Sequence, residues 1–278
     1  MNTPPTSRIQ ESDQKSDFAK IVGKEIFEFI REKSPLKVRS RVNKSHDHYQ
    51  KALKLKGHDE EMAAIRLIAA EEELVVAIFE LLKLKSEKVP AHADFIKKFK
   101  NHRVKLAFYP VLSQFRWVLI AHFENGITLA DLIDATVKLV IKDGAILLQT
   151  TDQNGTNIFN LNPLSIIVTQ GDKTSDEVVD ELFQDFSKHV AEQLDLSVKE
   201  FVLARANYRN KLLYAEDAGI EVTSEALNDL LPVFEQAFHD LLWVLAVLLG
   251  NDVPSADWGV ASQFISLYRK VLLEAKLL

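Results

Sequence analysis

Histidines and arginines lie close together at several points of the chain, and these residue types can carry out metal-free phosphate chemistry. Histidine exchanges a proton near neutral pH, so it can act as the base that activates a ribose 2′-hydroxyl. Arginine binds a phosphate with its planar guanidinium and offsets the charge that builds up during cleavage. In the basic segment 33–56, Arg41 and His46 form one such pair, the weaker alternative to the cluster that follows.

One acidic residue interrupts the apolar face of the helix predicted over residues 62–84. The apolar positions alternate between spacings of three and four, and they are Ile65, Ile68, Val75, Phe79 and Leu82. The same spacing assigns Glu72 to the middle of this face. A carboxylate on a buried helix face is costly unless another group bonds to it. We therefore expect a side chain from elsewhere in the chain to reach Glu72.

Two basic segments offer partners for Glu72. His102 and Lys105 are three residues apart, which places them on one face of a helix, and the alternative is that this helix is merely solvated. Arg205 and Arg209 are four residues apart and also share a helix face. Such an arginine pair can hold a carboxylate or a phosphate, and the alternative is a purely structural salt bridge.

We predict that these side chains converge in one polar pocket, with His102 as general acid or base and Arg209 as the phosphate clamp. The candidate catalytic set is His102, Arg209, Glu72, Lys105 and Tyr214. The residues predicted to contact RNA are Arg39, Arg41, Lys44, Arg103 and Arg205.

The competing hypothesis is a non-catalytic helical interaction protein, a dimeric module that binds a partner or RNA. The same polar residues would then form a satisfied buried network that sets how the helices pack. The apolar run 241–249 (LLWVLAVLL) would be either the central core helix or a dimer interface.

The amino-acid composition excludes several classes of protein and favours a helical fold. The chain has 278 residues, 47% of them hydrophobic, which suffices for a sizeable core. It has only 9 glycines and 8 prolines, which favours long helices. The lack of cysteine excludes disulfides and cysteine-ligated zinc and agrees with a cytoplasmic location. We find no signal peptide, no apolar run long enough to cross a bilayer and no cofactor motif, so we expect no cofactor, metal or membrane association.

Periodicity and capping residues predict a mainly α fold with a small inserted β-hairpin. Residues 1–16 are predicted to be a disordered arm, and 17–278 a single helical domain. The hairpin is predicted over 145–170, with strands 145–151 and 158–170 flanking the turn sequence DQNG. Helices are predicted over 17–33, 37–56, 59–85, 92–123 with a kink or break near Pro110, 128–142, 175–194, 197–213, 223–249 and 255–278.

Several segments, taken in order, resemble the AbiV group of HEPN domains. HYQKAL at 48–53 precedes AAIRLIAAEEE at 63–73, as a "Y..A..L" helix precedes one ending in "A.EE" in that group. NHRVKL at 101–106 resembles its "H..K" segment. RNKLLYAE at 209–216 resembles its "R...LY.D" segment, with Glu216 in place of Asp. The chain has no arginine–histidine pair at the start of a late helix, where HEPN nucleases usually carry R-x4–6-H.

The resemblance implies an up-and-down helical bundle, a HEPN-like core over about residues 37–219 that often forms a homodimer. It does not cover the hairpin predicted at 145–170 or the C-terminal helical pair predicted at 223–278. It also implies a role in bacterial abortive infection, in which a toxin-like protein halts the infected cell. Many HEPN proteins are metal-independent ribonucleases, and others only bind RNA, nucleotides or partners. We therefore expect a cytoplasmic antiviral effector that acts on RNA or a ribosome-associated target, with a phage protein as its trigger.

Overall fold

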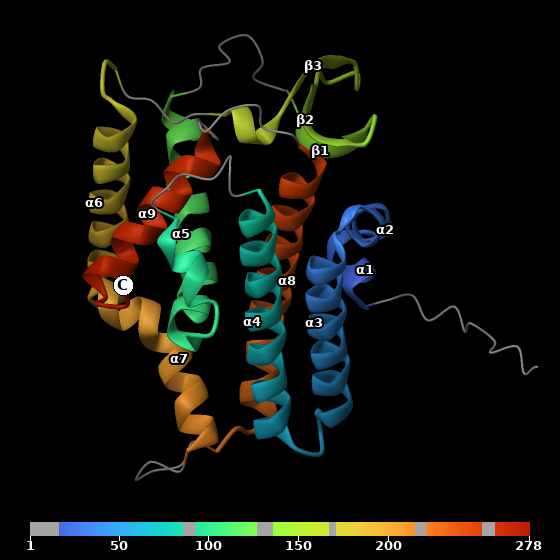
Figure 1. Ribbon diagram of the computed structural model, residues 1–278, viewed down its shortest axis with the longest axis vertical. Helices are drawn as coiled ribbons and strands as arrows, with labels where there is room; N and C mark the ends of the chain where they lie inside the picture. Colours follow the sequence, from blue (N-terminus) through green and yellow to red (C-terminus); the bar gives the residue numbers. More distant parts are fainter. Residues whose placement is uncertain (1–16, 86–92, 127–135, 167–170, 215–220, 252–258) are drawn as a thin grey trace, which may run out of the picture.

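A computed structural model describes residues 17–85, 93–126, 136–166, 171–214, 221–251 and 259–278. This part of the chain is mainly helical with one small antiparallel sheet, as predicted (Figure 1). The predicted disordered arm, residues 1–16, lies outside the described residues. The helices are α1 (Asp17–Val22), α2 (Lys24–Lys33), α3 (Leu36–Leu55), α4 (Glu60–Leu84), α5 (His102–Gly126), α6 (Ser175–Leu194), α7 (Val198–Leu213), α8 (Ser224–Gly250) and α9 (Val260–Glu274). The strands are β1 (Thr136–Lys142), β2 (Ala145–Thr151) and β3 (Asn157–Leu161), and the short 3₁₀ helices are η1 (Asp94–Lys98) and η2 (Pro163–Ser165).

Side chains that cap the backbone set several helix starts. Asp59 caps α4 by accepting a backbone N–H of its first turn. Thr174 with Glu177 and Ser197 with Glu200 form capping boxes at α6 and α7, in which each side chain accepts the backbone N–H of the other residue. These local signals explain why the predicted ends of these three helices agree with the structure to within a residue or two.

Two predictions about helix continuity are wrong. The helix predicted over 17–33 is split at Gly23, whose φ of 91° is a left-handed conformation that ends α1 before α2 begins. By contrast, α5 runs through Pro110 without a break. The side chains of Phe108 and Val111 on either side of it are buried, so core packing offsets the hydrogen bond that proline removes. The break predicted near Pro110 instead falls between η1 and α5.

Helix α4 lies in the middle of the molecule, against α3, α5, α7 and α8 (Figure 1). One apolar core joins side chains from every helix from α1 to α9. Its aromatic part on the α5 and α9 side brings together Phe79, Phe95, Phe108 and Tyr268, in three edge-to-face pairs and one tilted pair, Phe79 with Phe95. Because α4 has neighbours on most sides, it carries buried side chains around most of its circumference.

The small sheet has the strand order β1-β2-β3 and is antiparallel throughout. The predicted hairpin turn is confirmed between β2 and β3, where Asp152 Oδ1 accepts the backbone N–H groups of Asn154 and Thr156 at 2.9 and 2.7 Å. The second strand was predicted too long: it ends at Leu161, because Asn162 caps the 3₁₀ helix η2 that follows. The predicted helix 128–142 is wrong over 136–142, because these residues form β1, paired to β2 through a turn at Asp143 and Gly144 with positive φ. Residues 128–135, and 167–170 of the predicted second strand, lie outside the described residues.

Helix α8 is, by length and hydropathy alone, long and apolar enough to cross a membrane. The contiguous apolar run 241–249 is only part of this helix of 27 residues, so the run alone did not indicate a length sufficient to cross a membrane. In the structure α8 packs against α1, α2 and α4, and Phe238, Leu241, Leu242 and Leu245 are fully buried. The helix is therefore a central element of the core, which was one of its two predicted roles.

Candidate functional site

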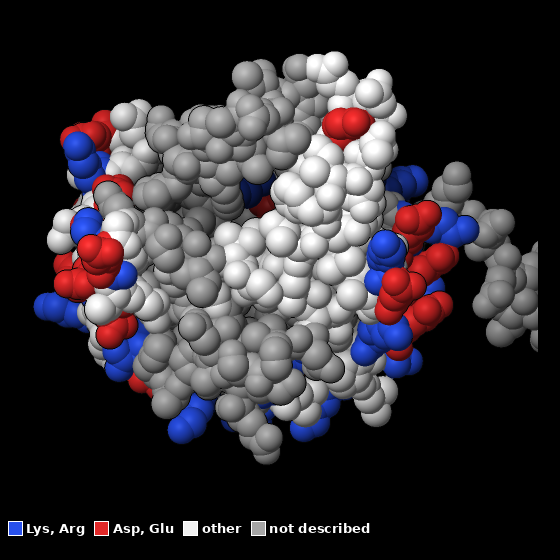
Figure 2. All heavy atoms as spheres, turned by 90° about the horizontal axis from the view of Figure 1, so that it is seen from above, with Lys and Arg blue, Asp and Glu red and all other residues white. Residues whose placement is uncertain are grey.

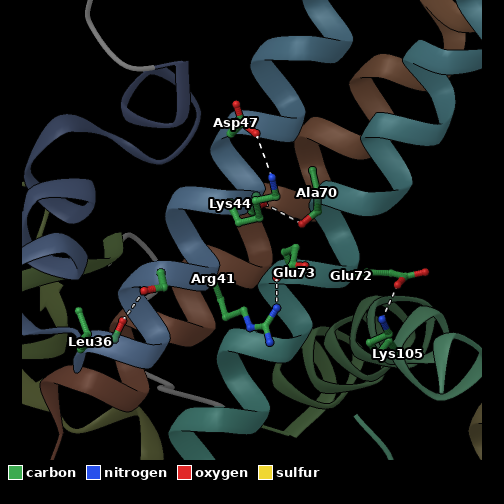
Figure 3. Close-up of polar contacts among 10 residues, drawn as sticks. Leu36, Arg41, Lys44, Asp47, Ala70, Glu72, Glu73 and Lys105 are labelled. Atoms are coloured by element: carbon green, nitrogen blue, oxygen red, sulfur yellow. Dashed lines mark hydrogen bonds and ion pairs between the residues drawn. The ribbon is translucent and has the colours of Figure 1, made fainter. Parts of the chain in front are cut away.

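Three consecutive glutamates on α4 connect this helix to three neighbours. Successive residues of an α-helix point about 100° apart, so Glu71, Glu72 and Glu73 face different directions. Glu71 faces α7, Glu72 faces α5 and α7, and Glu73 faces α3. Figure 3 shows Glu73 directed to Arg41 and Glu72 directed to Lys105, on different sides of α4.

Glu71 is the acid that the described part of the chain buries completely. It has no exposed surface, and Arg205 Nη1 donates a hydrogen bond to its Oε2. The guanidinium of Arg205 also lies over the rings of Tyr109 and Phe234, 5.1 and 4.8 Å from their centroids. Glu71 Oε1 is buried without a hydrogen-bond partner. Burial raises the pKa of Glu71 to about 7, against the opposing effect of the Arg205 charge.

The position of the buried acid was predicted wrongly by one residue. The side chain of Glu72 keeps 12% of its surface exposed, whereas Glu71 has none. The prediction assumed that α4 has one apolar stripe and one wet face. Because other helices surround α4, the stripe through Ile65 and Ile68 does not identify the most buried position of this helix. Ile65 is itself only half-buried.

Glu72 does have the partners predicted for it. Lys105 Nζ donates a hydrogen bond to Glu72 Oε2, and Arg209 Nε lies 3.2 Å from Glu72 Oε1 as an ion pair. Two cations therefore share one carboxylate, which leaves one positive charge in excess. The side chain of Arg209 is 28% exposed and that of Lys105 is 13% exposed, so this excess charge lies close to solvent.

His102, the first residue of α5, joins the same cluster. It is half-buried, and its Nε2 is buried without a hydrogen-bond partner. Burial lowers the pKa of His102, and the charge of Arg209 lowers it further, while Glu72 acts in the opposite direction. The imidazole is therefore neutral near pH 7 and can accept a proton. We refer to Glu72, His102, Lys105 and Arg209 as the Glu72 cluster.

Tyr214 does not share the buried environment predicted for it. It is the residue that ends α7, in an extended conformation, and its side chain is 61% exposed. It lies five residues beyond Arg209, about 140° around the helix axis, so it does not share the face that carries the arginine.

The alternative pair of Arg41 and His46 does not form a joint site. Arg41 Nη1 bonds to Glu73 at 2.9 Å, on the α4 side of α3. The ring of His46 packs against Phe18 and Phe27, with centroids 5.1 and 6.2 Å apart, on the α1 and α2 side. Residues five apart on one helix point away from each other, which explains the separation.

The residues predicted to contact RNA do not form one surface. Arg39 donates to the backbone carbonyl of Ser34 at 2.9 Å, and Lys44 pairs with Asp47 at 3.4 Å. Arg103 is exposed beside His102, whereas Arg205 is committed to the buried Glu71. Of this set, Arg103 is the one next to the Glu72 cluster.

Within the ranges that the structure describes, no three His, Asp or Glu side chains gather as a metal site would require. The residue that sequence reasoning missed at the site is Glu71. The signal for it was that apolar residues occupy 16 of the 22 positions over 63–84, too many for one stripe, which indicates a helix that is buried on most sides.

Comparison of the chain with family models, with curated proteins and with solved structures found no match in any of the three.

Proposed function

We propose that this chain is a HEPN-type defence effector that acts on RNA, and that the Glu72 cluster is its site. The observation that carries the proposal is a half-buried histidine beside two cations that share one carboxylate. Burial lowers the pKa of this histidine, which favours the neutral form that accepts a proton. The side-by-side helices α3, α4, α5 and α7, which hold the segments that resemble the AbiV group, support the HEPN-like bundle. In this proposal the protein is a cytoplasmic homodimer, triggered by a phage protein, and its target is RNA or a ribosome-associated complex.

The cluster has the parts of a metal-independent transesterification. The imidazole of His102 takes the proton of a ribose 2′-hydroxyl, and the 2′-oxygen bonds to phosphorus as the bond to the 5′-oxygen breaks. The 5′-oxygen takes a proton from water, which gives a 2′,3′-cyclic phosphate and a 5′-hydroxyl. Arg209 and Lys105 offset the charge on the phosphate during this step. Glu72 holds both cations in place in the absence of RNA.

The test compares His102→Gln and Arg209→Lys with matched exposed variants, His189→Gln and Arg31→Lys. Each protein is first checked for folding by its melting temperature. Wild type and the matched variants are expected to arrest growth on induction, or to lower phage plating. Purified, they are expected to cut total RNA in EDTA to products with cyclic phosphate ends. His102→Gln should lose cleavage by at least 100-fold while retaining RNA binding, because general base catalysis contributes about that much.

A second candidate function has its own observation in its favour. Glu71 and Arg205 form a buried pair, and the three glutamates of α4 hold three other helices, as a structural network would. In that case the chain is a non-catalytic interaction protein. Wild type would then not cleave RNA, whether or not it retains RNA on a filter, and Arg209→Lys would lower stability without changing any activity. That combination of results would overturn the first proposal.

A further inference from the structure

A cavity of about 430 Å³ lies between α4, α5, α8 and α9, apart from the Glu72 cluster. Its wall is apolar except at one place, where Arg116, His239 and Asp240 line it beside Trp243. Folded interiors have few voids larger than a water molecule, because an empty space forfeits dispersion contacts. An apolar cavity of about 150 Å³ already stays dry and takes up benzene. The cavity has the volume of a small-molecule site, for which about 300–1,000 Å³ is typical.

The polar place in the wall is built around the carboxylate of Asp240. Trp243 Nε1 donates to His239 Nε2 at 3.1 Å, so His239 Nδ1 carries the proton and donates to Asp240 Oδ1 at 3.0 Å. Gln236 Nε2 donates to the same oxygen at 2.8 Å. Arg116 Nη1 also donates to Oδ1, at 3.3 Å. These bonds hold the carboxylate in one orientation and use up the acceptor capacity of Oδ1.

One acceptor atom and one donor atom at this polar site have no hydrogen-bond partner. Asp240 Oδ2 is buried without a hydrogen bond, although Arg116 Nη1 lies 3.2 Å away as an ion pair. Arg116 Nε is also buried without an acceptor. An unsatisfied buried donor and an unsatisfied buried acceptor are costly, and a ligand that both donates and accepts would satisfy them together.

The opposite charges of Arg116 and Asp240 disfavour a ligand that carries a net charge. Arg116 and Asp240 neutralise each other, so neither a carboxylate nor an ammonium group gains a net attraction there. Either charge would have to leave water next to an apolar wall, which is unfavourable. The side chain of Arg116 is 42% exposed, which places this polar site at the edge of the cavity.

We propose that this cavity binds an uncharged amphiphile, a molecule with an apolar body and one head group, hydroxyl or primary amide, that both donates and accepts. The body fills the space between Phe108, Leu112, Val244 and Phe264. The head donates to Asp240 Oδ2 and accepts from Arg116 Nε. Figure 2 looks onto the end of the molecule where the sheet lies: among the described atoms, charged side chains gather at the edge and the middle is mostly uncharged.

The experiment measures binding of three ten-carbon probes to the full chain by calorimetry and by the shift in melting temperature. The probes are 1-decanol, decanoate and decylamine, each below its micelle concentration. Decanol is expected to bind at least tenfold more tightly than either charged probe. Equal binding of all three, or no binding of decanol, would overturn the proposal.

Two variants test whether decanol binds in this cavity and whether its head group contacts Asp240. Ala261→Phe fills the cavity and should abolish decanol binding; binding that persists in this folded variant would overturn the assignment. Asp240→Asn leaves Arg116 without its counter-charge, so decanoate should gain at least tenfold and overtake decanol, an outcome that does not depend on whether Ala261→Phe folds. The matched control is Asp229→Asn, an exposed acid on the same helix, which should leave the order of the three probes unchanged. If Asp240→Asn also leaves that order unchanged, the head-group site is wrong.

Discussion

Glu71→Gln should remove a pH dependence from the stability of this protein. The carboxyl of Glu71 has no exposed surface, and burial raises its pKa from 4.5 to about 7. Between these values the folded chain holds a proton that the unfolded chain has released. The free energy of unfolding therefore falls as the pH rises through this window, and the loss is complete above about pH 7.

The size of the effect follows from the two pKa values. One pKa unit corresponds to about 1.4 kcal/mol, so a shift from 4.5 to about 7 corresponds to a loss of about 3 kcal/mol. This is a large part of the stability of an ordinary domain, about 5–15 kcal/mol. The charge of Arg205 opposes the shift, so its removal should raise the pKa of Glu71 further and move the window to higher pH.

The assay is urea unfolding followed by circular dichroism at pH values from 4.5 to 8. Histidines with lowered pKa values, such as His48 and His102, give stability the opposite slope over part of this range. The measured quantity is therefore the difference between the wild-type and Glu71→Gln curves, in which those contributions cancel. Glu61→Gln, on the exposed part of α4, is the matched control and should run parallel to wild type.

Parallel curves for wild type and Glu71→Gln would refute the reasoning, because Glu71 would then not take up a proton on folding. Arg205→Met provides a second check. It should shift the pH window upward in the wild-type background and leave the pH dependence of Glu71→Gln unchanged. A shift in both backgrounds would mean that Arg205 acts on some group other than Glu71.

Two further substitutions test the packing and the helix ends. Phe238→Ala removes a fully buried ring that contacts Phe18 and Tyr49, and should lower the free energy of unfolding by about 3–5 kcal/mol in urea titrations; a loss below about 1 kcal/mol would contradict the packing described. Thr174→Ala removes the capping box of α6 and should cost about 1 kcal/mol, whereas Thr174→Ser should cost little. Hydrogen exchange should place that effect in the first turn of α6, and an effect spread over all helices would argue against it.

Local chemistry made most helices predictable. A capping side chain such as Thr174 or Ser197 acts on backbone groups within three residues, so the sequence alone contains the signal. The turn at Asp152 is local in the same sense, since its carboxylate accepts N–H groups two and four residues on. The cationic partners of Glu72 were also predictable, because a poorly solvated acid requires them and few segments could supply them.

Contacts between residues far apart in the sequence determined the structure where the sequence pattern allowed more than one conformation. Residues 136–142 have the composition of a strand or of a buried helix, and their pairing with β2, with Leu139 opposite Leu148, selects the strand. Pro110 remains inside α5 because of the core around it.

The sequence by itself determined the mainly helical class, most helix ends, the β2–β3 hairpin and the need for cations at the acids of α4. The tertiary structure decided that Glu71, rather than Glu72, is the fully buried acid, that Tyr214 and His46 lie away from the Glu72 cluster, and that α4, α5, α8 and α9 line a cavity. The physical reason is the same in each case. Capping and turns depend on neighbours along the chain, whereas burial, pKa and cavities depend on which helices surround a side chain.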